Sequence, residues 1–285
     1  MTNIIGAIIN DCHDDLARTR QELRFTSLFG VTPTFAGVAS YDSVEAGGTL
    51  ADLLDVLTQF PVADTTRDAV ILVNAAPRGE DVQERWDNGT PFCYFRVGRV
   101  LVVGTYEGRW LALVRDLGIA NEVELLDIPA VTAAAVERSE LTAVEASKIN
   151  NSQFRSLEFL PLVAYWLHLG KDVPSEKRSL AGLPSASGLV WHVDNFGNAK
   201  TTLRAADVDF VRGQAVTLVG GLKATCYERL ADVPAGTLGL TIGSSGYGPH
   251  RFLELAVGQR GRAADEYGLA VGVTLLGNKV TDKVQ

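Results

Sequence analysis

The first half of the chain alternates short apolar runs with stretches in which apolar residues recur at helical spacing. The opening run, Ile4 to Ile9, is short, continuous and rich in β-branched residues, which predicts a buried strand. The same patterns predict further strands at residues 34–39, 69–73 and 97–105, and helices at residues 15–29, 48–60, 107–117 and 157–170. Strands that alternate with helices in this way predict an α/β domain with a mostly parallel sheet.

The pattern changes in the second half, where short apolar runs are separated by turns. The expected strands there are residues 189–193, 199–203, 215–219, 238–242, 253–257 and 272–276. Pro, Ser and Gly are frequent just before them, which predicts a linker. We therefore expect an α/β domain over residues 1–175, a linker over 176–188, and an all-β domain, a barrel or a sandwich, over 189–285.

Composition narrows the class of protein. The chain has 285 residues, 46% of them hydrophobic, and a net charge of −8 without any basic block, so nucleic acid is not an expected partner. Its three cysteines, Cys12, Cys93 and Cys226, lack metal-ligand spacing and fit a reducing compartment. No signal peptide and no long apolar run is visible. We expect a cytoplasmic protein that binds a small molecule, no membrane and no metal.

The common nucleotide and hydrolase motifs are absent. No Gly-x-Gly-x-x-Gly follows the first strand, and neither Gly-x-x-x-x-Gly-Lys-Ser/Thr nor Gly-x-Ser-x-Gly occurs. A site in the first domain is therefore expected at the carboxyl ends of its strands. Asp11 follows the first strand at such an end, and its carboxylate can hold a ribose diol. The alternative is that it caps the next helix, although Asp14 and Asp15 are better candidates for the cap.

The second half contains a distinctive turn, Asp194-Asn195-Phe196-Gly197-Asn198, between two expected strands. Such a turn brings a carboxylate, Asp194, and a carboxamide, Asn198, to the same volume. The carboxylate can accept from an ammonium group or a sugar hydroxyl, and the carboxamide can read the edge of a heterocycle. The alternative is an Asx turn with no ligand.

The order of these motifs resembles the S-adenosylmethionine (SAM) hydroxide adenosyltransferase family, which includes the fluorinase and the chlorinase. The resemblance rests on a first strand ending at Asp11, the Asp194–Asn198 turn, the stretch Gly243-Ser244-Ser245-Gly246-Tyr247, and the run Leu253-Glu254-Leu255-Ala256. It spans most of the chain, is clearest in the last hundred residues and is thin between about residues 10 and 110. It marks the chain as a divergent member.

The resemblance implies roles for several residues. Asp11 would hold the ribose diol, Asp194 would face the α-amino group of the methionine part, and Asn198 would read the adenine edge. Trp110 falls in the segment that lies near adenine in the family, and its ring can stack on a base.

The group that binds the methionine carboxylate differs from the family pattern. Halogenating members use a Ser-Arg pair, whereas this chain has Ser244 and Ser245 at those places and lacks the arginine. Arg18 and Arg251 are candidate replacements, because a guanidinium is a natural partner of a carboxylate. The alternative for each is a solvated surface arginine.

The residues expected at the reacting centre depart furthest from the family pattern. Members that transfer hydroxide place an Asp, an Arg and a His around the attacking water. In this chain Asn74, in the segment Val73–Gly79, stands in place of the Asp, and Arg155 stands in place of the His. A carboxamide can position a water but cannot act as a base. The halide site of the halogenases is not visible.

The resemblance implies a homotrimeric enzyme that binds SAM between its two domains and hydrolyses it to adenosine and methionine at the ribose 5′ carbon. No cofactor beyond SAM itself is expected. Two alternatives stay open, a binding or sensor protein that has lost turnover, and an enzyme that transfers adenosyl to a nucleophile other than water.

Overall fold

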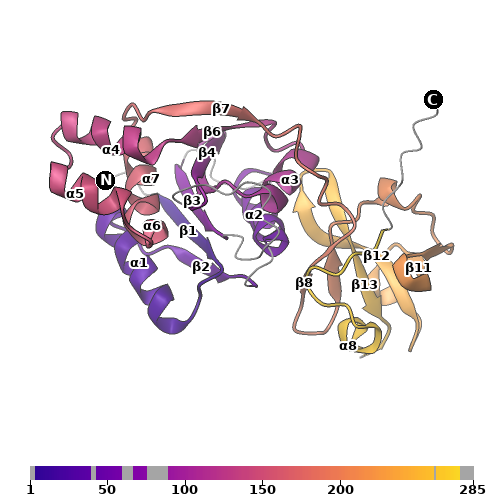
Figure 1. Cartoon of the computed structure of the whole chain (residues 1–285). Coiled ribbons are helices and arrows are strands. Elements are labelled where there is room, and N and C mark those ends of the chain that lie inside the picture. Colours follow the sequence, from indigo (N-terminus) through magenta and orange to yellow (C-terminus); the bar gives the residue numbers. More distant parts are fainter. Residues whose placement is uncertain (1–3, 40–42, 60–66, 76–88, 260, 277–285) are drawn as a thin grey trace, which may run out of the picture. The chain divides into compact units, whose positions relative to one another are not determined.

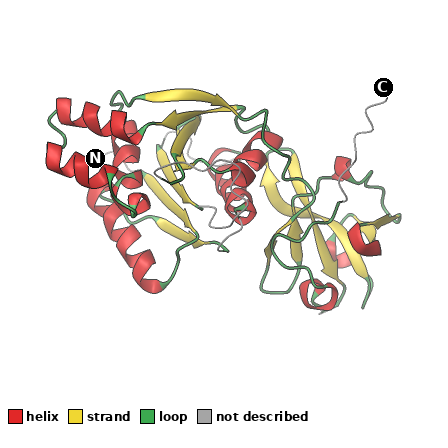
Figure 2. Ribbon diagram, in the orientation of Figure 1, coloured by secondary structure: helices red, strands yellow, loops and turns green. Residues whose placement is uncertain are grey.

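The computed structural model of the chain describes residues 4–39, 43–59, 67–75, 89–259 and 261–276. The chain divides into two compact units, Met1–Pro184 and Ser185–Gln285 (Figures 1 and 2). Residues 76–79, the end of the segment that begins at Val73, lie outside the described residues. None of the described helices combines the length and the apolar character needed to span a bilayer.

Unit 1 is built on a seven-stranded sheet with the order β2-β1-β3-β5-β4-β6-β7. Its strands are β1 (Ile5–Asn10), β2 (Thr34–Gly37), β3 (Ala69–Asn74), β4 (Phe92–Val97), β5 (Val100–Thr105), β6 (Glu122–Leu126) and β7 (Ser175–Ser179). Strands β2, β1, β3 and β5 are parallel neighbours, whereas β4 is antiparallel to both β5 and β6. The carboxyl ends of β1, β3, β5 and β6 therefore lie at the same edge of the sheet. This α/β architecture confirms the expectation for the first domain.

Helices cover both faces of this sheet (Figure 1). They are α1 (Asp15–Phe29), α2 (Val44–Thr58), α3 (Gly108–Asp116), α4 (Ile128–Glu137), α5 (Ala143–Asn150), α6 (Arg155–Glu158) and α7 (Leu160–His168). Phe25 of α1 packs with Ile8 and Leu72 of the sheet in the main core. Gly6 of β1 allows Phe25 to pack closely on the sheet, because a Cβ at position 6 would clash with the Phe25 ring. The central strands β1, β3 and β5 are covered on both faces and are apolar up to a polar residue at their carboxyl ends, so the sequence shows them as continuous apolar runs.

Asp14 determines where α1 begins. Its carboxylate accepts hydrogen bonds from the backbone N–H groups of Leu16 and Ala17, both at 3.0 Å, which confirms Asp14 as the helix cap. Asp11 therefore has no capping role in α1.

Two elements of unit 1 differ from the sequence expectation. The strand expected over residues 97–105 contains only the last residue of β4, then a turn with Gly98 at a φ of 56°, and then β5, which pairs antiparallel with β4. Residues 175–179, most of which fall in the expected linker, form the edge strand β7 and pair with β6. The sequence of β7, Ser-Glu-Lys-Arg-Ser, is charged because an edge strand is largely exposed, so it carries no apolar signal.

Unit 2 is built on a six-stranded sheet with the order β10-β11-β12-β13-β9-β8. Its strands are β8 (Val190–Val193), β9 (Ala199–Thr201), β10 (Ala215–Thr217), β11 (Lys223–Tyr227), β12 (Leu238–Tyr247) and β13 (His250–Val257), and a short helix, α8 (Ala263–Tyr267), follows them. The β character of this unit confirms the expectation. The strand expected at 272–276 is reduced to an isolated bridge between Leu189 and Thr274.

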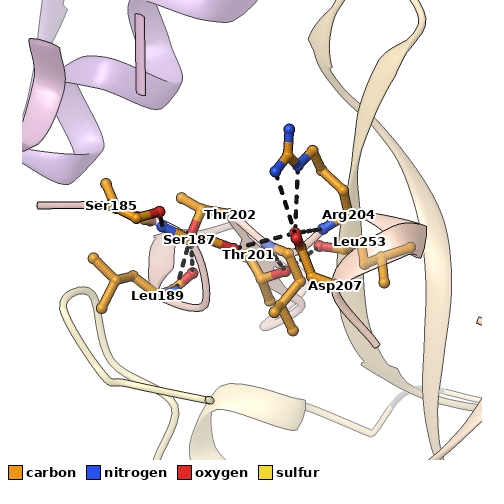
Figure 3. Close-up of polar contacts among 10 residues, drawn as sticks. Ser185, Ser187, Leu189, Thr201, Thr202, Arg204, Asp207 and Leu253 are labelled. Carbon is orange, nitrogen blue, oxygen red and sulfur yellow. Dashed lines mark hydrogen bonds and ion pairs between the residues drawn. The ribbon is translucent and has the colours of Figure 1, made fainter. Parts of the chain in front are cut away.

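Side-chain hydrogen bonds attach residues 185–189 to the rest of unit 2 (Figure 3). The Thr202 hydroxyl donates to the Ala186 carbonyl at 2.7 Å and accepts from the Leu189 N–H at 2.9 Å. The Ser187 hydroxyl donates to the Asp207 carboxylate at 3.1 Å. These bonds explain why unit 2 begins at Ser185, although its first strand begins later.

Candidate functional site

The carboxyl edge of the unit 1 sheet gathers polar side chains. Asn10 ends β1, Asn74 ends β3, and the two residues are register partners. The Asn74 carboxamide donates to Oδ1 of Asn10 at 2.8 Å, and both side chains are buried. Thr105, at the end of β5, donates its hydroxyl to the Ala75 carbonyl at 2.8 Å. Parallel strands thus bring residues that are distant in sequence to one edge, where α/β folds place their ligands.

A cavity of about 450 Å³, which we call the edge cavity, opens at this place. Its walls come from the ends of β3, β4 and β5, from α1, and from α6 with the loop before it. The lining residues are Cys12, Ala17, Arg20, Gln21, Asn74, Thr90, Phe92, Thr105, Gln153, Phe154, Arg155, Ser156 and Leu157. Asn74 and Arg155, the two residues expected to flank the nucleophile, therefore line the same cavity. Its volume is within the usual range for a small-molecule site.

Arg155 gives this cavity a positive wall. Its guanidinium is half-buried and forms no hydrogen bond or ion pair within the described residues, and burial lowers its pKa from the ordinary value. A Cβ at position 89 would collide with Nη2 of Arg155, so Gly89 leaves room for the guanidinium. Arg20 is the second cation of the lining, which includes no carboxylate among the described residues. The lining thus favours an anion or a neutral polar group.

Asp11 is buried next to this cavity but is not part of its lining. It is 5% exposed, and its backbone N–H donates to the Asn74 carbonyl at 3.0 Å. The neighbouring Asn10 keeps Nδ2 buried without a hydrogen-bond partner in the described part of the chain. An unpaired buried amide donor is costly, so this edge has unused capacity to donate a hydrogen bond.

In unit 2 the structure brings Asp194 and Asn198 together. Oδ1 of Asp194 accepts from the backbone N–H groups of Phe196 and Asn198 at 2.8 and 2.9 Å. Its Oδ2 accepts from the Asn198 carboxamide at 3.0 Å. The turn is therefore an Asx turn whose carboxylate already organises its own backbone. A carboxylate has about four acceptor sites in all, so one remains for a ligand.

A polar cluster lies on the neighbouring strands, consisting of Lys200, Ser245, Glu254, His192 and Trp191. The Lys200 ammonium donates to the Ser245 hydroxyl at 2.9 Å and lies 5.9 Å from the centre of the Trp191 ring. Lys200 is the register partner of Glu254 on β13 and of His192 on β8. Nε1 of Trp191 is buried and has no hydrogen-bond partner among the described residues. This face of the sheet therefore carries charges of both signs and an unused donor.

The pKa of the Glu254 carboxyl in this cluster is raised. Burial raises the pKa of its carboxyl above the ordinary value, and this effect exceeds the opposing effect of the Lys200 charge. The nearby Asp194 raises the pKa further, whereas His192 lowers it. Within the residues that the structure describes, no group of three or more His, Cys, Asp or Glu side chains is arranged to hold a metal ion.

The comparisons with known proteins bear on the family and the fold. Residues 188–276 match the family model described as the SAM hydroxide adenosyltransferase C-terminal domain. The C-terminal unit thus matches the C-terminal domain of the SAM hydroxide adenosyltransferase family. This match supports membership of the chain in the family and confirms the resemblance drawn from its motifs. It points to a SAM hydroxide adenosyltransferase-like function and an adenosyltransferase-type enzyme.

A solved structure agrees with the fold. The structure of an uncharacterised conserved protein from Thermotoga maritima is similar, with a TM-score of 0.64 and 16% sequence identity over 94% of this chain and 98% of that one. At this identity the likeness establishes the fold alone. A search of curated proteins gives no match.

One residue expected to bind SAM lies instead in the core of this adenosyltransferase-like chain. Trp110 is completely buried, so it presents no ring face for stacking on a base. Its indole N–H donates to the Thr105 carbonyl at 2.9 Å, and its ring packs near Phe95 with 6.4 Å between ring centres. A Cβ at Gly104 would lie 2.7 Å from the Val73 carbonyl oxygen and 3.2 Å from the Trp110 ring, so this glycine permits close packing on both sides.

The expected replacements for the family's arginine are engaged elsewhere. Arg18 is 53% exposed and pairs with Glu22 at 2.8 Å on the surface of α1, whereas Arg20 on the same helix lines the edge cavity. Nη1 of Arg251 donates to the backbone carbonyl of Ser244 at 3.2 Å within the β12–β13 hairpin. Neither of these contacts involves Asp194 or Asn198.

Ser244 and Ser245 differ in burial, and the sequence pattern did not indicate the cation, Lys200, that contacts Ser245. Ser244 is exposed, whereas Ser245 is 4% exposed and accepts from Lys200. Lys200 reads as an ordinary strand residue, and only the cross-strand register brings it to Ser245 and Glu254. Asn10 was also missed, although its position at the end of a buried apolar strand was a usable signal.

Proposed function

We propose that this protein binds SAM and displaces methionine from the ribose 5′ carbon with water, giving adenosine. The family match of residues 188–276 gives the adenosyltransferase class. The single structural observation behind the hydrolytic step is that Asn74 and Arg155 line one cavity at the carboxyl edge of the sheet. Their positions correspond to the nucleophile-binding residues that the resemblance implies.

The resemblance assigns substrate contacts to residues of both units. In unit 2, Asp194 holds the α-ammonium, Asn198 reads adenine, and Ser245 binds the carboxylate. Lys200, which donates to Ser245 at 2.9 Å, supplies the cation that Arg18 and Arg251 were expected to supply. In unit 1, Asp11 contributes to binding of the ribose diol.

The chemistry suits a site without a strong base. Attack of water on the 5′ carbon forms a C–O bond, breaks the C–S bond and releases the thioether of methionine as a neutral leaving group. The water loses its proton to solvent. Such a displacement depends mostly on in-line alignment and desolvation. Asn74 orients the water, and the positive charge of Arg155 favours its hydroxide form.

Two alternative functions are favoured by specific observations. The Asn74 carboxamide is hydrogen-bonded to Asn10 and cannot act as a base, which favours a SAM-binding protein without turnover. The lining of the edge cavity, with Arg20 and Arg155 and no described carboxylate, favours an anionic nucleophile in place of water.

The deciding experiment is incubation of the purified protein with SAM in water enriched in oxygen-18. Hydrolysis predicts free methionine and adenosine that carries the label at its 5′ hydroxyl, detected by chromatography with mass spectrometry. Arg155→Met should abolish this product, whereas Arg212→Met, which removes an exposed arginine of unit 2, should not. SAM binding without product supports the binding protein, and unlabelled adenosyl product that requires an added anion supports the second nucleophile. No binding of SAM at all refutes all three.

Assembly and location complete the proposal. We propose a homotrimer in the cytoplasm, on the grounds of the family resemblance and of three free cysteines. Light scattering should then give about three times the chain mass of 30.6 kDa. A mass equal to one chain would refute the trimer and leave the chemistry to be judged by the labelling experiment.

A further inference from the structure

A second cavity, of about 580 Å³, lies at the same edge of unit 1, over the carboxyl end of β6. Arg155 lines both this cavity and the edge cavity, so the two are neighbours. We call the second one the β6 cavity. Its other walls are largely apolar, formed by Leu125, Leu126, Ile128, Pro91, Pro129 and Pro174.

Arg178 of β7 is the second cation of the β6 cavity. Its Nε is buried and makes no hydrogen bond in the described part of the chain, and neither Arg178 nor Arg155 has an ion-pair partner there. By contrast, the partly buried Arg115, Arg138 and Arg204 each pair with a carboxylate. A buried guanidinium N–H without an acceptor is costly, and a carboxylate ligand would remove that cost.

Two acids also line the β6 cavity but do not neutralise these arginines. The Asp127 carboxylate caps α4 by accepting from the Ala130 N–H at 3.4 Å. Glu176 is exposed, and the described ion pairs join neither acid to Arg155 or Arg178. The guanidinium donors therefore stay available, while the acids disfavour a ligand with several negative charges.

We propose that the β6 cavity binds a small organic carboxylate, whose charged end is held by Arg155 and Arg178 and whose apolar body packs against Leu125, Leu126 and Ile128. A guanidinium recognises a carboxylate through parallel N–H donors, and the apolar walls favour a ligand with a hydrocarbon part over an inorganic anion. Because Arg155 also lines the edge cavity, such a ligand would bind next to the reacting centre proposed above. The proposal itself does not depend on SAM chemistry.

Calorimetric titration of the full chain with hexanoate at constant ionic strength tests this site. Hexanamide has the same hydrocarbon part without the charge, and inorganic phosphate has charge without a hydrocarbon part. We expect hexanoate to bind at least about tenfold more tightly than either of them, since one charged hydrogen bond accounts for such a factor. Equal binding of hexanamide or of phosphate would overturn the proposal, and this comparison needs no variant.

Variants on one strand then locate the site. Arg178→Met should weaken hexanoate binding about tenfold or more, because it removes the guanidinium while it keeps the length of the side chain. Lys177→Met is the matched control, since it removes a neighbouring cation that is paired with Glu122 at 2.9 Å and does not line the cavity. Unchanged binding in Arg178→Met, or equal weakening in both variants, would place any hexanoate site elsewhere. Circular dichroism confirms that each variant is folded.

Discussion

The Asp194 turn allows a structural role to be separated from a ligand role. Asp194→Ala removes the acceptor of three hydrogen bonds, at 2.8, 2.9 and 3.0 Å. Each contributes about 1 kcal/mol net in a partly buried setting, so the free energy of unfolding of unit 2 should fall by about 2–3 kcal/mol. The backbone bond from the Asp194 N–H to the Asn198 carbonyl, at 3.0 Å, does not involve the side chain and should keep the turn from opening completely.

Asp194→Asn is the informative partner variant. Its amide oxygen can still accept from the two backbone N–H groups, and only the bond from the Asn198 carboxamide is lost, so we expect a loss of about 1 kcal/mol. The carboxylate charge is removed, however. If Asp194 holds the α-ammonium of SAM, this variant should bind SAM about tenfold or more weakly although it is nearly as stable as the wild type.

Stability is measured by thermal and denaturant unfolding, and the turn itself is followed by hydrogen exchange of peptides that cover residues 193–203. A double-mutant cycle of Asp194→Ala and Asn198→Ala isolates the interaction between the Asp194 and Asn198 side chains, and should give a coupling energy of about 1 kcal/mol. Wild-type stability in Asp194→Ala, with protected amides at Phe196 and Asn198, would refute the assignment of the carboxylate as the organiser of the turn. Unchanged SAM affinity in Asp194→Asn would refute its role in binding.

Four further predictions follow from single contacts. Trp110→Phe removes the donor to the Thr105 carbonyl and should lower the unfolding free energy of unit 1 by about 1–3 kcal/mol, followed by circular dichroism at helical wavelengths, while the SAM affinity of the folded protein stays constant. Weaker SAM binding by Trp110→Phe at unchanged stability would instead indicate that Trp110 contacts the ligand. Burial raises the pKa of Glu254, so the contribution of its protonated carboxyl to stability is complete at low pH and is lost as the pH rises from the ordinary glutamate pKa through the raised one. Glu254→Gln should therefore be as stable as the wild type in acid and more stable than the wild type above that pH range. Parallel pH profiles of stability for the two proteins would contradict this. Asn74→Asp supplies a carboxylate to the edge cavity and should increase adenosine release as the pH rises, whereas identical pH profiles would argue against a nucleophile-positioning role. Lys200→Met should weaken binding of SAM about tenfold but leave adenosine binding unchanged, because adenosine has no carboxylate, and equal weakening of both would exclude that role.

Features that depend on local pattern could be predicted from the amino-acid sequence. The continuous run from Ile4 to Ile9 predicted a buried strand, and Asp14 predicted the start of α1, because burial on both faces and helix capping act over a few residues. For the Asp194 turn the sequence offered an Asx turn as the alternative to a ligand site, and the hydrogen bonds of the Asx turn all fall within five residues. Motif order then led to the family that the C-terminal match supports.

Contacts between side chains that are distant in sequence became visible only in the folded chain. Sheet order and strand register brought Asn74 beside Asn10 and placed Lys200 against Ser245, and no local pattern encodes either pairing. Trp110 looked available to a base, but helix packing over Gly104 buried it completely. The charged edge strand β7 was hidden in an apparent linker because exposed edges need no apolar residues. Local chemistry fixes what an element is, whereas burial and adjacency depend on how distant elements pack, and these decide what each side chain can do.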